Sequence, residues 1–304
     1  MPAHRNAAPR SLDLPILRCA RGDISPNVAL MHMAREARDA TDVERALSDA
    51  CARVQRRDAA AARRLRRALD LWRRTPAAFG TMTDILRIAD APTRAGTAEE
   101  GIAHWASVFD RAAEVSPEAS VALYSLGNPD LLDAATTEVV DWMHGRGLLA
   151  DDGAVLEIGC GIGRFIARLA RSAWLAVGID VSQRMIDTAR RRCAHLPSAA
   201  FVRSSGRDLS AFRDGTFDLV YSVDTFPYLV QLGGDIAAAH IRDAARVLRP
   251  GGRLLILNYS YRGDAVLDRR DVAAAAGDAG LALLCNGTRE FTLWDGAAFL
   301  MARS

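Results

Sequence analysis

The clearest chemistry in this chain lies in a short segment with glycine at alternate positions. Gly159, Gly161 and Gly163 follow an apolar run, residues 154–158, and precede a helical pattern. Glycine has no Cβ, so the backbone at these positions can approach a ligand closely. The N-terminus of the following helix would offer N–H groups to electron-rich atoms. The segment therefore predicts a ligand-binding turn between a strand and a helix.

An acidic residue stands where a nucleoside site needs one. Asp180 lies at the end of the next apolar run, residues 175–179. A carboxylate there can accept hydrogen bonds from both hydroxyls of a ribose. The dinucleotide fingerprint requires a third glycine three positions after the second, and counting from Gly161 that position is Arg164. The pattern thus predicts a nucleoside site and argues against a nicotinamide-dependent oxidoreductase.

The elements that must position these residues are short apolar runs alternating with helical segments. This alternation is typical of βαβ units and a parallel sheet. The last two runs, with Trp294-Asp295-Gly296 between them, predict a hairpin at the end of the chain. The expected strands are residues 154–158, 175–179, 200–203, 219–223, 253–258, 281–286 and 298–302.

A helical pattern occupies the chain from about residue 25 to residue 142. We expect three parts: a flexible N-terminus over residues 1–20, a helical cap over residues 21–120, and an α/β domain over residues 121–304. Capping side chains and prolines predict where helices begin. The expected starts are at Ser25-Pro26, Thr41 to Glu44, Thr97 to Glu100 and Asn128-Pro129.

Composition excludes several classes of protein. The net charge is +2 over 304 residues, so there is no global attraction to nucleic acid. No apolar run reaches the ~18 residues of a membrane span, and residues 1–10 lack the apolar core of a secretion signal, so we expect a cytoplasmic protein. The five cysteines are far apart and predict reduced thiols without a metal. The chain contains no lysine, which excludes Schiff-base chemistry.

One basic stretch has two interpretations. Residues 53–74 contain nine arginines, with Leu65, Leu69 and Trp72 at helical spacing. This helix could face RNA or a membrane, or it could be a solvated helix that packs on its neighbours through the apolar stripe. We favour packing, because no aromatic residues are interleaved to stack on bases.

The glycine segment and the residues after it resemble the class I S-adenosylmethionine-dependent methyltransferases. Glu157 stands two residues before the Gly-x-Gly-x-Gly spacing, and Asp180 is followed by Gly206-Arg207-Asp208, residues 217–222 and residues 247–254, in the family's order. The resemblance covers residues 120–304. It implies a Rossmann-like α/β fold: a seven-stranded, mostly parallel sheet with an antiparallel last strand and helices on both faces. It also implies S-adenosylmethionine as cofactor and S-adenosylhomocysteine as product.

The resemblance assigns a set of cofactor-binding residues. It places Glu157 near the methionine part, Asp180 at the ribose and Asp208 at the exocyclic amine of adenine, although Asp180 could instead cap the next helix and Asp208 could be a turn residue. An aromatic residue upstream of the sheet often closes over the cofactor in this family. The full expected set is Glu157, Gly159, Gly161, Gly163, Asp180, Val181, Arg207, Asp208, Ser222 and Tyr124.

Residues after the fourth strand should face the transferable methyl group, because ligands bind beyond the carboxyl ends of parallel strands. Asp224 is the candidate for orienting a cationic or protic substrate or taking its proton, and Tyr228 is the second catalytic candidate. A helix-capping aspartate and a half-buried aromatic residue are the structural alternatives.

The connection after the fifth strand is rich in polar side chains. Asn258, Tyr259 and Arg262 could bind a polar, carboxylated substrate, since a guanidinium matches a carboxylate; an ordinary polar loop is the alternative. The sequence after the fourth strand lacks the Asn/Asp-Pro-Pro-Tyr/Phe signature of many amino-methylases.

The sequence therefore predicts methyl transfer to a small polar molecule, an amino-acid-like one among the options. The acceptor atom stays open among oxygen, nitrogen, sulfur and carbon. An RNA-directed methyltransferase or accessory protein gripping RNA with residues 53–74 is the alternative, and a cofactor-binding regulator without turnover is a third. A homodimer is possible, and no metal is expected.

Overall fold

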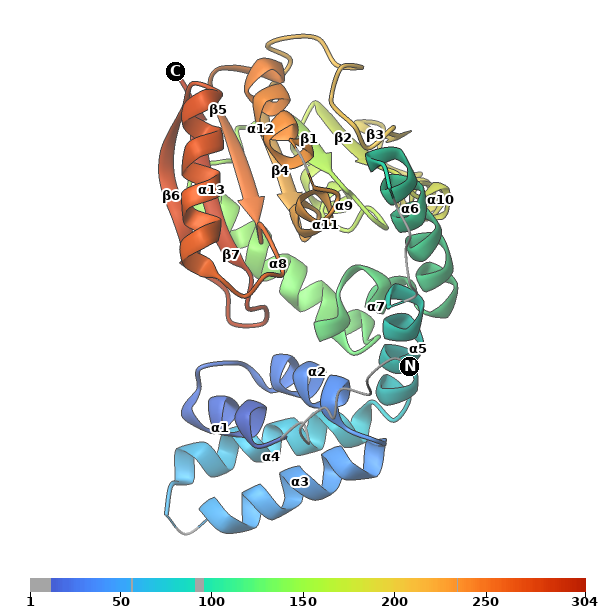
Figure 1. The fold of residues 1–304 in the computed structure, drawn as a ribbon, viewed down its shortest axis with the longest axis vertical. Helices are drawn as coiled ribbons and strands as arrows, with labels where there is room; N and C mark the ends of the chain where they lie inside the picture. Colours follow the sequence, from blue (N-terminus) through green and yellow to red (C-terminus); the bar gives the residue numbers. More distant parts are fainter. Residues whose placement is uncertain (1–11, 56, 91–95, 234) are drawn as a thin grey trace, which may run out of the picture. The chain divides into compact units, whose positions relative to one another are not determined.

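The computed structural model describes residues 12–55, 57–90, 96–233 and 235–304. These residues form two compact units (Figure 1). The first comprises the described residues up to 90 with residues 115–132 and 292–295, and the second comprises residues 96–114, 133–291 and 296–304. The division differs from the expected boundary near residue 120. Residues 96–114 of the N-terminal region group with the sheet, and residues 292–295 near the C-terminus group with the helices.

The first unit is built from helices. Their bounds are α1 (Asp13–Arg21), α2 (Pro26–Glu36), α3 (Ala40–Val54), α4 (Ala59–Arg74), α5 (Ala78–Ala89), α7 (Pro117–Val121) and the 3₁₀ turn η1 (Leu123–Ser125). Two details correct the sequence prediction. Residues 13–20, expected to be flexible, lie in α1 because Ile16 and Cys19 are buried against neighbouring helices. Helix α3 begins before the expected capping box, since the Asp39 side chain accepts from the backbone N–H of Asp42.

The basic stretch forms most of α4, and its apolar stripe is buried. Leu65, Leu69 and Trp72 pack in the bundle of α1, α2 and α3, and the Trp72 indole donates to the carbonyl of Ala40 at 3.2 Å. The packing interpretation is therefore confirmed for the stripe. Arg56 lies outside the described residues.

The second unit contains a seven-stranded sheet in the order β3-β2-β1-β4-β5-β7-β6. Neighbouring strands from β3 to β5 pair in parallel, and β7 is antiparallel to both β5 and β6. The expected sheet is confirmed. The bounds are β1 (Ala154–Ile158), β2 (Leu175–Asp180), β3 (Ala199–Arg203), β4 (Phe217–Val223), β5 (Leu248–Leu257), β6 (Leu281–Arg289) and β7 (Ala297–Arg303).

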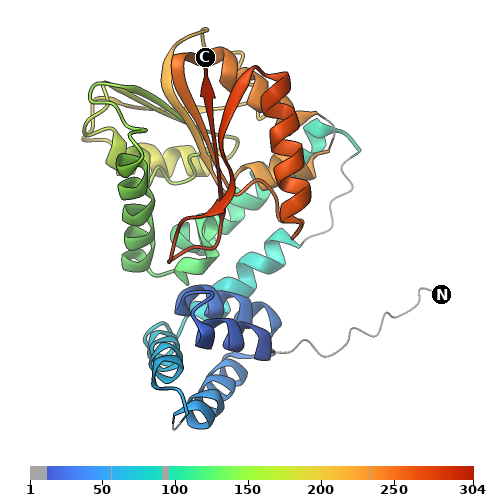
Figure 2. The same ribbon diagram turned by 90° about the vertical axis from the view of Figure 1, so that its left-hand side faces the viewer.

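Helices cover both faces of this sheet, as Figure 2 shows for the two sides. One face carries α8 (Pro129–Gly145), α9 (Ile166–Leu169) and α10 (Gln183–Arg192); the other carries α11 (Phe226–Gln231), α12 (Ile236–Val247) and α13 (Ala265–Asp278). The main core lies under α12 and α13 and includes Ile158, Val220, Ile241, Ile256 and Phe299. This core fixes the strands whose carboxyl ends hold the candidate site.

Helix α6 (Ala98–Val115) belongs to the second unit over nearly its whole length. Its expected capping box is confirmed: the Thr97 hydroxyl accepts from the N–H of Glu100, and the Glu100 carboxylate accepts from the N–H of Thr97, each at 3.2 Å. In the described ranges, no helix combines the length and the apolar character needed to cross a bilayer.

Candidate cofactor and acceptor site

The glycine turn after β1 adopts the backbone conformation that the sequence predicts. Gly159, Gly161 and Gly163 have φ values of 72°, 50° and 72°, which disfavour side chains. Contacts within the protein require glycine at two of these three positions. A Cβ on Gly159 would lie 1.9 Å from the hydroxyl of Thr225, and a Cβ on Gly163 would lie 2.9 Å from the Cβ of Ala189. These contacts hold the turn tightly between β4 and α10.

A short helix follows the turn, as the sequence predicts. Residues 161–165 form turns, and α9 has four residues starting at Ile166. The N–H groups of Gly159 and Cys160 in the turn donate to the carbonyl of Ile179. The contact of the helix N-terminus with a ligand stays a prediction.

Asp180 joins the end of β2 to this turn. One carboxylate oxygen accepts from the N–H of Gly161 and the other from the N–H of Ser182, both at 2.9 Å. Burial raises the pKa of Asp180 to about 6 despite these bonds. Ser182 caps α10 through a bond from the N–H of Met185, so the helix-cap alternative for Asp180 is wrong. Each carboxylate oxygen has two lone pairs, so both oxygens can accept a further hydroxyl.

Glu157 lies inside the unit, beside the turn. It is 2% exposed, and the hydroxyl of Tyr221 on the neighbouring strand donates to its carboxyl group at 3.0 Å. Burial raises the pKa of Glu157 to about 8, and the nearby charge of Arg164 only partly opposes this. The side chain is therefore mainly protonated at neutral pH, and the contact expected with the methionine part stays a prediction.

The segment after β3 packs closely on its neighbours. A Cβ on Gly206 would lie 2.7 Å from a methyl of Val181 and 3.0 Å from Ile102 of α6. The Arg207 guanidinium forms an ion pair with Glu99 of α6 at 2.9 Å, and its backbone N–H donates to Ser205. Val181 and Arg207 thus lie between the end of β2 and α6.

Asp208 forms a turn. One of its oxygens accepts from the backbone N–H and the hydroxyl of Ser210, at 3.1 and 2.7 Å, and these bonds lower the pKa of Asp208. The turn alternative is confirmed. The second oxygen is not needed for it, so the expected contact with the adenine amine stays a prediction.

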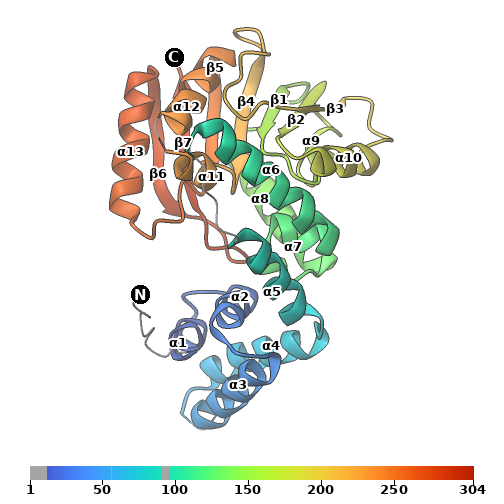
Figure 3. The ribbon, with the colours of Figure 1, turned by 45° about the vertical axis from the view of Figure 1, so that its right-hand side comes forward.

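Helix α6 crosses the edge of the sheet where β2 and β4 end (Figure 3). Asp110 accepts from the hydroxyl of Ser182 at 2.5 Å and from the N–H of Arg184 at 3.1 Å, and Glu114 pairs with the Arg184 guanidinium. Together with the Arg207 pair, these bonds fix α6 over the residues expected to bind the nucleoside. No local sequence signal marks Asp110, because its partners lie more than seventy residues away.

Beyond the carboxyl ends of β4 and β5, two polar residues with unusual backbone geometry are hydrogen-bonded to each other. Asp224 and Asn258 directly follow the neighbouring parallel strands β4 and β5, and their φ values are 58° and 70°. The Asn258 amide donates to the Asp224 carboxylate at 2.7 Å, and the Tyr261 hydroxyl donates to the same oxygen at 3.2 Å. Strained non-glycine residues of this kind persist where the surroundings hold them, and they cluster at functional sites.

A row of aromatic rings extends from Tyr261, which donates to Asp224, to α6. The Tyr228 ring packs edge-to-face with Trp105 and Phe109 of α6, with centroids 4.5 and 5.0 Å apart, and with Tyr261 at 5.8 Å. Tyr228 is half-buried, in agreement with the structural alternative, and its ring contacts that of Tyr261. Sequence reasoning placed Tyr228 here but missed Tyr261.

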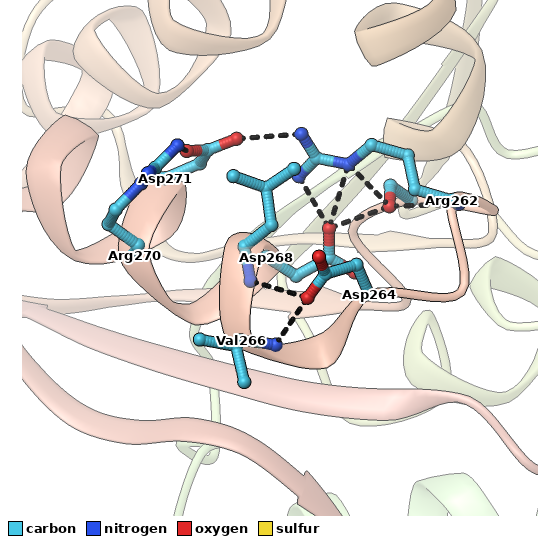
Figure 4. A network of polar contacts seen from close by, with 8 residues as sticks. Arg262, Asp264, Val266, Asp268, Arg270 and Asp271 are labelled. Atoms are coloured by element: carbon cyan, nitrogen blue, oxygen red, sulfur yellow. Dashed lines mark hydrogen bonds and ion pairs between the residues drawn. The ribbon is translucent and has the colours of Figure 1, made fainter.

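Arg262 and Tyr259 are engaged in other contacts. The Arg262 guanidinium donates to Asp268 at 2.5 Å and to Asp271 at 2.8 Å, both on α13, as Figure 4 shows. Tyr259 is buried between Phe226 and Phe299. The expectation that they bind a carboxylated substrate is not supported, because two carboxylates neutralise the guanidinium and core packing holds the phenol.

Two further expected residues lie in different surroundings. Ser222 is fully buried on β4, paired with Ile158 and Ile256, and within the described part of the chain its hydroxyl has no hydrogen-bond partner. Tyr124 belongs to the first unit, where it is buried against Trp294. The cofactor contacts expected of both stay predictions.

The sheet order, with the glycine turn after β1 and the carboxylate at the end of β2, defines a Rossmann-like α/β domain. Residues 156–256 match the family model described as a methyltransferase domain. Residues 156–256 are therefore similar to a methyltransferase domain, and the strand order agrees with the Rossmann-like fold expected from the class I S-adenosylmethionine-dependent methyltransferases.

Named relatives share part of this chain. It is 36% identical over 107 residues to the demethylmenaquinone methyltransferase of Tropheryma whipplei, covering 35% of this chain and 42% of that protein. It is 29% identical over 145 residues to the 2-methyl-6-phytyl-1,4-hydroquinone methyltransferase of Synechocystis, covering 45% of this chain and 44% of that protein. The chain thus spans less than half the length of these two relatives.

A solved structure shares the fold. Phosphoethanolamine N-methyltransferase 1 of Haemonchus contortus, in complex with phosphoethanolamine and S-adenosylhomocysteine, aligns with a TM-score of 0.51 and 16% identity. The alignment covers 68% of this chain and 49% of that one. At this identity the likeness shows the fold alone.

Proposed function

We propose that this protein transfers a methyl group from S-adenosylmethionine to a small organic molecule. The observation that carries the proposal is the Asp180 carboxylate, which is bonded to the N–H of Gly161 and keeps lone pairs for two ribose hydroxyls. The relatives named for quinone-type substrates support a small organic acceptor. The buried stripe of α4 supports a helix that packs on its neighbours over one that grips RNA.

The residues at the site fit the cofactor. The carboxylate of Asp180 suits a ribose, and the backbone at Gly161 lies at the end of β1, where the family's sheet binds its ligand. S-adenosylmethionine supplies an electrophilic methyl group when bound. The protein's own contribution is alignment and exclusion of water, and alignment alone can supply roughly 7–11 kcal/mol.

Each part of the site contributes to that alignment. Asp180 would orient the sugar, α6 would shield the reacting atoms through its bonds to Ser182 and Arg207, and Asp224 would orient the acceptor. The bonds from Asn258 and Tyr261 hold Asp224 in its left-handed conformation, so its carboxylate keeps one direction.

The proposal is tested by assaying S-adenosylhomocysteine release against a panel of amines, phenols, hydroquinones, thiols and carboxylates. We expect methylated product from the wild type and from Asp278→Asn, an exposed control at the end of α13, and at least about tenfold less from Asp180→Ala. Cofactor binding without product from any acceptor would contradict the proposal and favour a regulator.

A further inference from the structure

We propose that Asp110 of α6 is a positioning residue of the cofactor site, which acts on the Asp180 carboxylate through Ser182. This inference rests on the proposed function, in which Asp180 holds the ribose. Hydrogen bonds within the second unit join Asp110 to Ser182, Ser182 to Asp180, and Asp180 to the glycine turn at Gly161. We call these four residues the ribose relay.

Ser182 connects the two carboxylates of the relay. Its backbone N–H donates to Asp180 at 2.9 Å, and its hydroxyl donates to Asp110 at 2.5 Å. The hydroxyl oxygen also accepts from the N–H of Met185, and this bond leaves its single proton for Asp110. Ser182 is fully buried, so water cannot replace a lost acceptor, and an unpaired buried hydroxyl is costly. Asp110 therefore holds Ser182 where its N–H reaches Asp180.

Asp110 holds the same segment at a second point. The oxygen that accepts from Ser182 also accepts from the backbone N–H of Arg184 at 3.1 Å. Arg184 lies in the first turn of α10, where N–H groups have no partner within the helix. A negative charge is favourable at this end of a helix. Asp110 thus fixes both the capping residue and the first turn of α10 from a distant helix.

The charge of Asp110 also reaches Asp180. Burial is the main cause that raises the pKa of Asp180 to about 6, and repulsion from Asp110 adds to it. Burial also raises the pKa of Glu157 to about 8 and that of Cys160 well above its usual value, so these two groups stay mainly protonated near pH 6. Other ionisable groups of the neighbouring elements are Glu114, Arg184 and Arg203.

The relay links cofactor affinity to pH. An ionised carboxylate accepts hydrogen bonds only, whereas a protonated one carries an O–H that competes with this role. The affinity for a ribose should therefore rise as Asp180 loses its proton. Because a neighbouring negative charge disfavours ionisation, removing the charge of Asp110 should move this rise to lower pH.

The test measures S-adenosylhomocysteine binding to the whole protein by calorimetry, between about pH 5 and about pH 7.5. Asp110→Asn keeps an oxygen that can accept from Ser182 and Arg184 but has no charge, and Asp110→Ala loses both. Glu114→Gln is the matched control, since its carboxylate lies on the same helix and pairs with Arg184 at the surface.

We expect the wild-type affinity to rise with a midpoint near pH 6, and both Asp110 variants to lower this midpoint by about half a unit or more. At pH 7, Asp110→Ala should bind at least about tenfold more weakly, and Asp110→Asn should stay within about threefold of the wild type. The control should keep the wild-type affinity and midpoint. Circular dichroism verifies that each variant keeps its helices.

A bond that only stabilises the fold would leave the midpoint of Asp110→Asn at the wild-type pH, and this result would overturn the inference. Wild-type affinity in Asp110→Ala would overturn it as well. Absence of S-adenosylhomocysteine binding by the wild type at every pH would instead overturn the proposed function. The two failures are therefore distinguishable.

Discussion

Glu157→Gln probes the buried carboxyl group beside the glycine turn. Burial raises the pKa of Glu157 from 4.5 to about 8 in the folded protein. Between these pH values the folded chain retains a proton that the unfolded chain has released, so this group makes the free energy of unfolding fall as pH rises. Glutamine keeps an oxygen that can accept from Tyr221 and never ionises.

The size of the effect is set by the shift. The difference between pKa values of 4.5 and about 8 corresponds to about 5 kcal/mol in the free energy of unfolding across the whole window. The free energy of unfolding of Glu157→Gln, relative to the wild type, should therefore rise by that order from about pH 4 to about pH 9. Below pH 4.5, Glu157 is protonated in both the folded and the unfolded wild type. Its ionisation therefore no longer changes the free energy of unfolding with pH there.

Urea unfolding at a series of pH values measures this difference. Glu114→Gln is the matched control, because its carboxylate is 55% exposed and pairs with Arg184 at the surface. The control should change the free energy of unfolding by less than about 1 kcal/mol throughout. A constant difference between Glu157→Gln and the wild type over the whole pH range would refute the reasoning.

Three further changes test separate parts of the structure. Gly159→Ala should destabilise the second unit by more than about 1 kcal/mol, because its Cβ would overlap Thr225 and its φ is 72°; an unchanged urea midpoint would contradict this. Trp72→Ala should cost the first unit about 3–5 kcal/mol through lost burial, measurable by circular dichroism on thermal unfolding, and a loss under about 1 kcal/mol would show that the stripe is not core. Arg262→Met should lower thermal stability and leave S-adenosylhomocysteine affinity unchanged, since the guanidinium pairs with Asp268 and Asp271; a selective loss of S-adenosylhomocysteine binding would place Arg262 in the site.

The sheet could be predicted because its signals are local. Residues 154–158 form an apolar run bounded by turns, and β1 has those bounds. The antiparallel last strand was expected from the family resemblance, since neither periodicity nor composition shows how strands pair, and the order of the strands was not predicted. The helix after the glycine turn was predicted, but its short length of four residues was not, because a closely packed turn at residues 161–165 has no sequence signal distinct from a helix start.

The site was only partly predictable, because its contacts join distant residues. The sequence identified Asp224 and Asn258 as polar residues after strands, but not that they bond each other across 34 positions. The Arg262 pairs could have been anticipated: Asp268 and Asp271 lie at helical spacing after the capping residue Asp264. The docking of α6 through Asp110 depends on tertiary packing and was not accessible from sequence.

The central claim is that S-adenosylmethionine binds at the glycine turn with its ribose held by Asp180. Titration calorimetry with S-adenosylhomocysteine tests it most directly, at about pH 8, where a carboxyl group of pKa about 6 is ionised. The wild type should bind with a stoichiometry of about one, and Asp180→Asn should weaken binding by about 1–3 kcal/mol. No heat with the wild type, or equal affinity of Asp180→Asn, would contradict the claim.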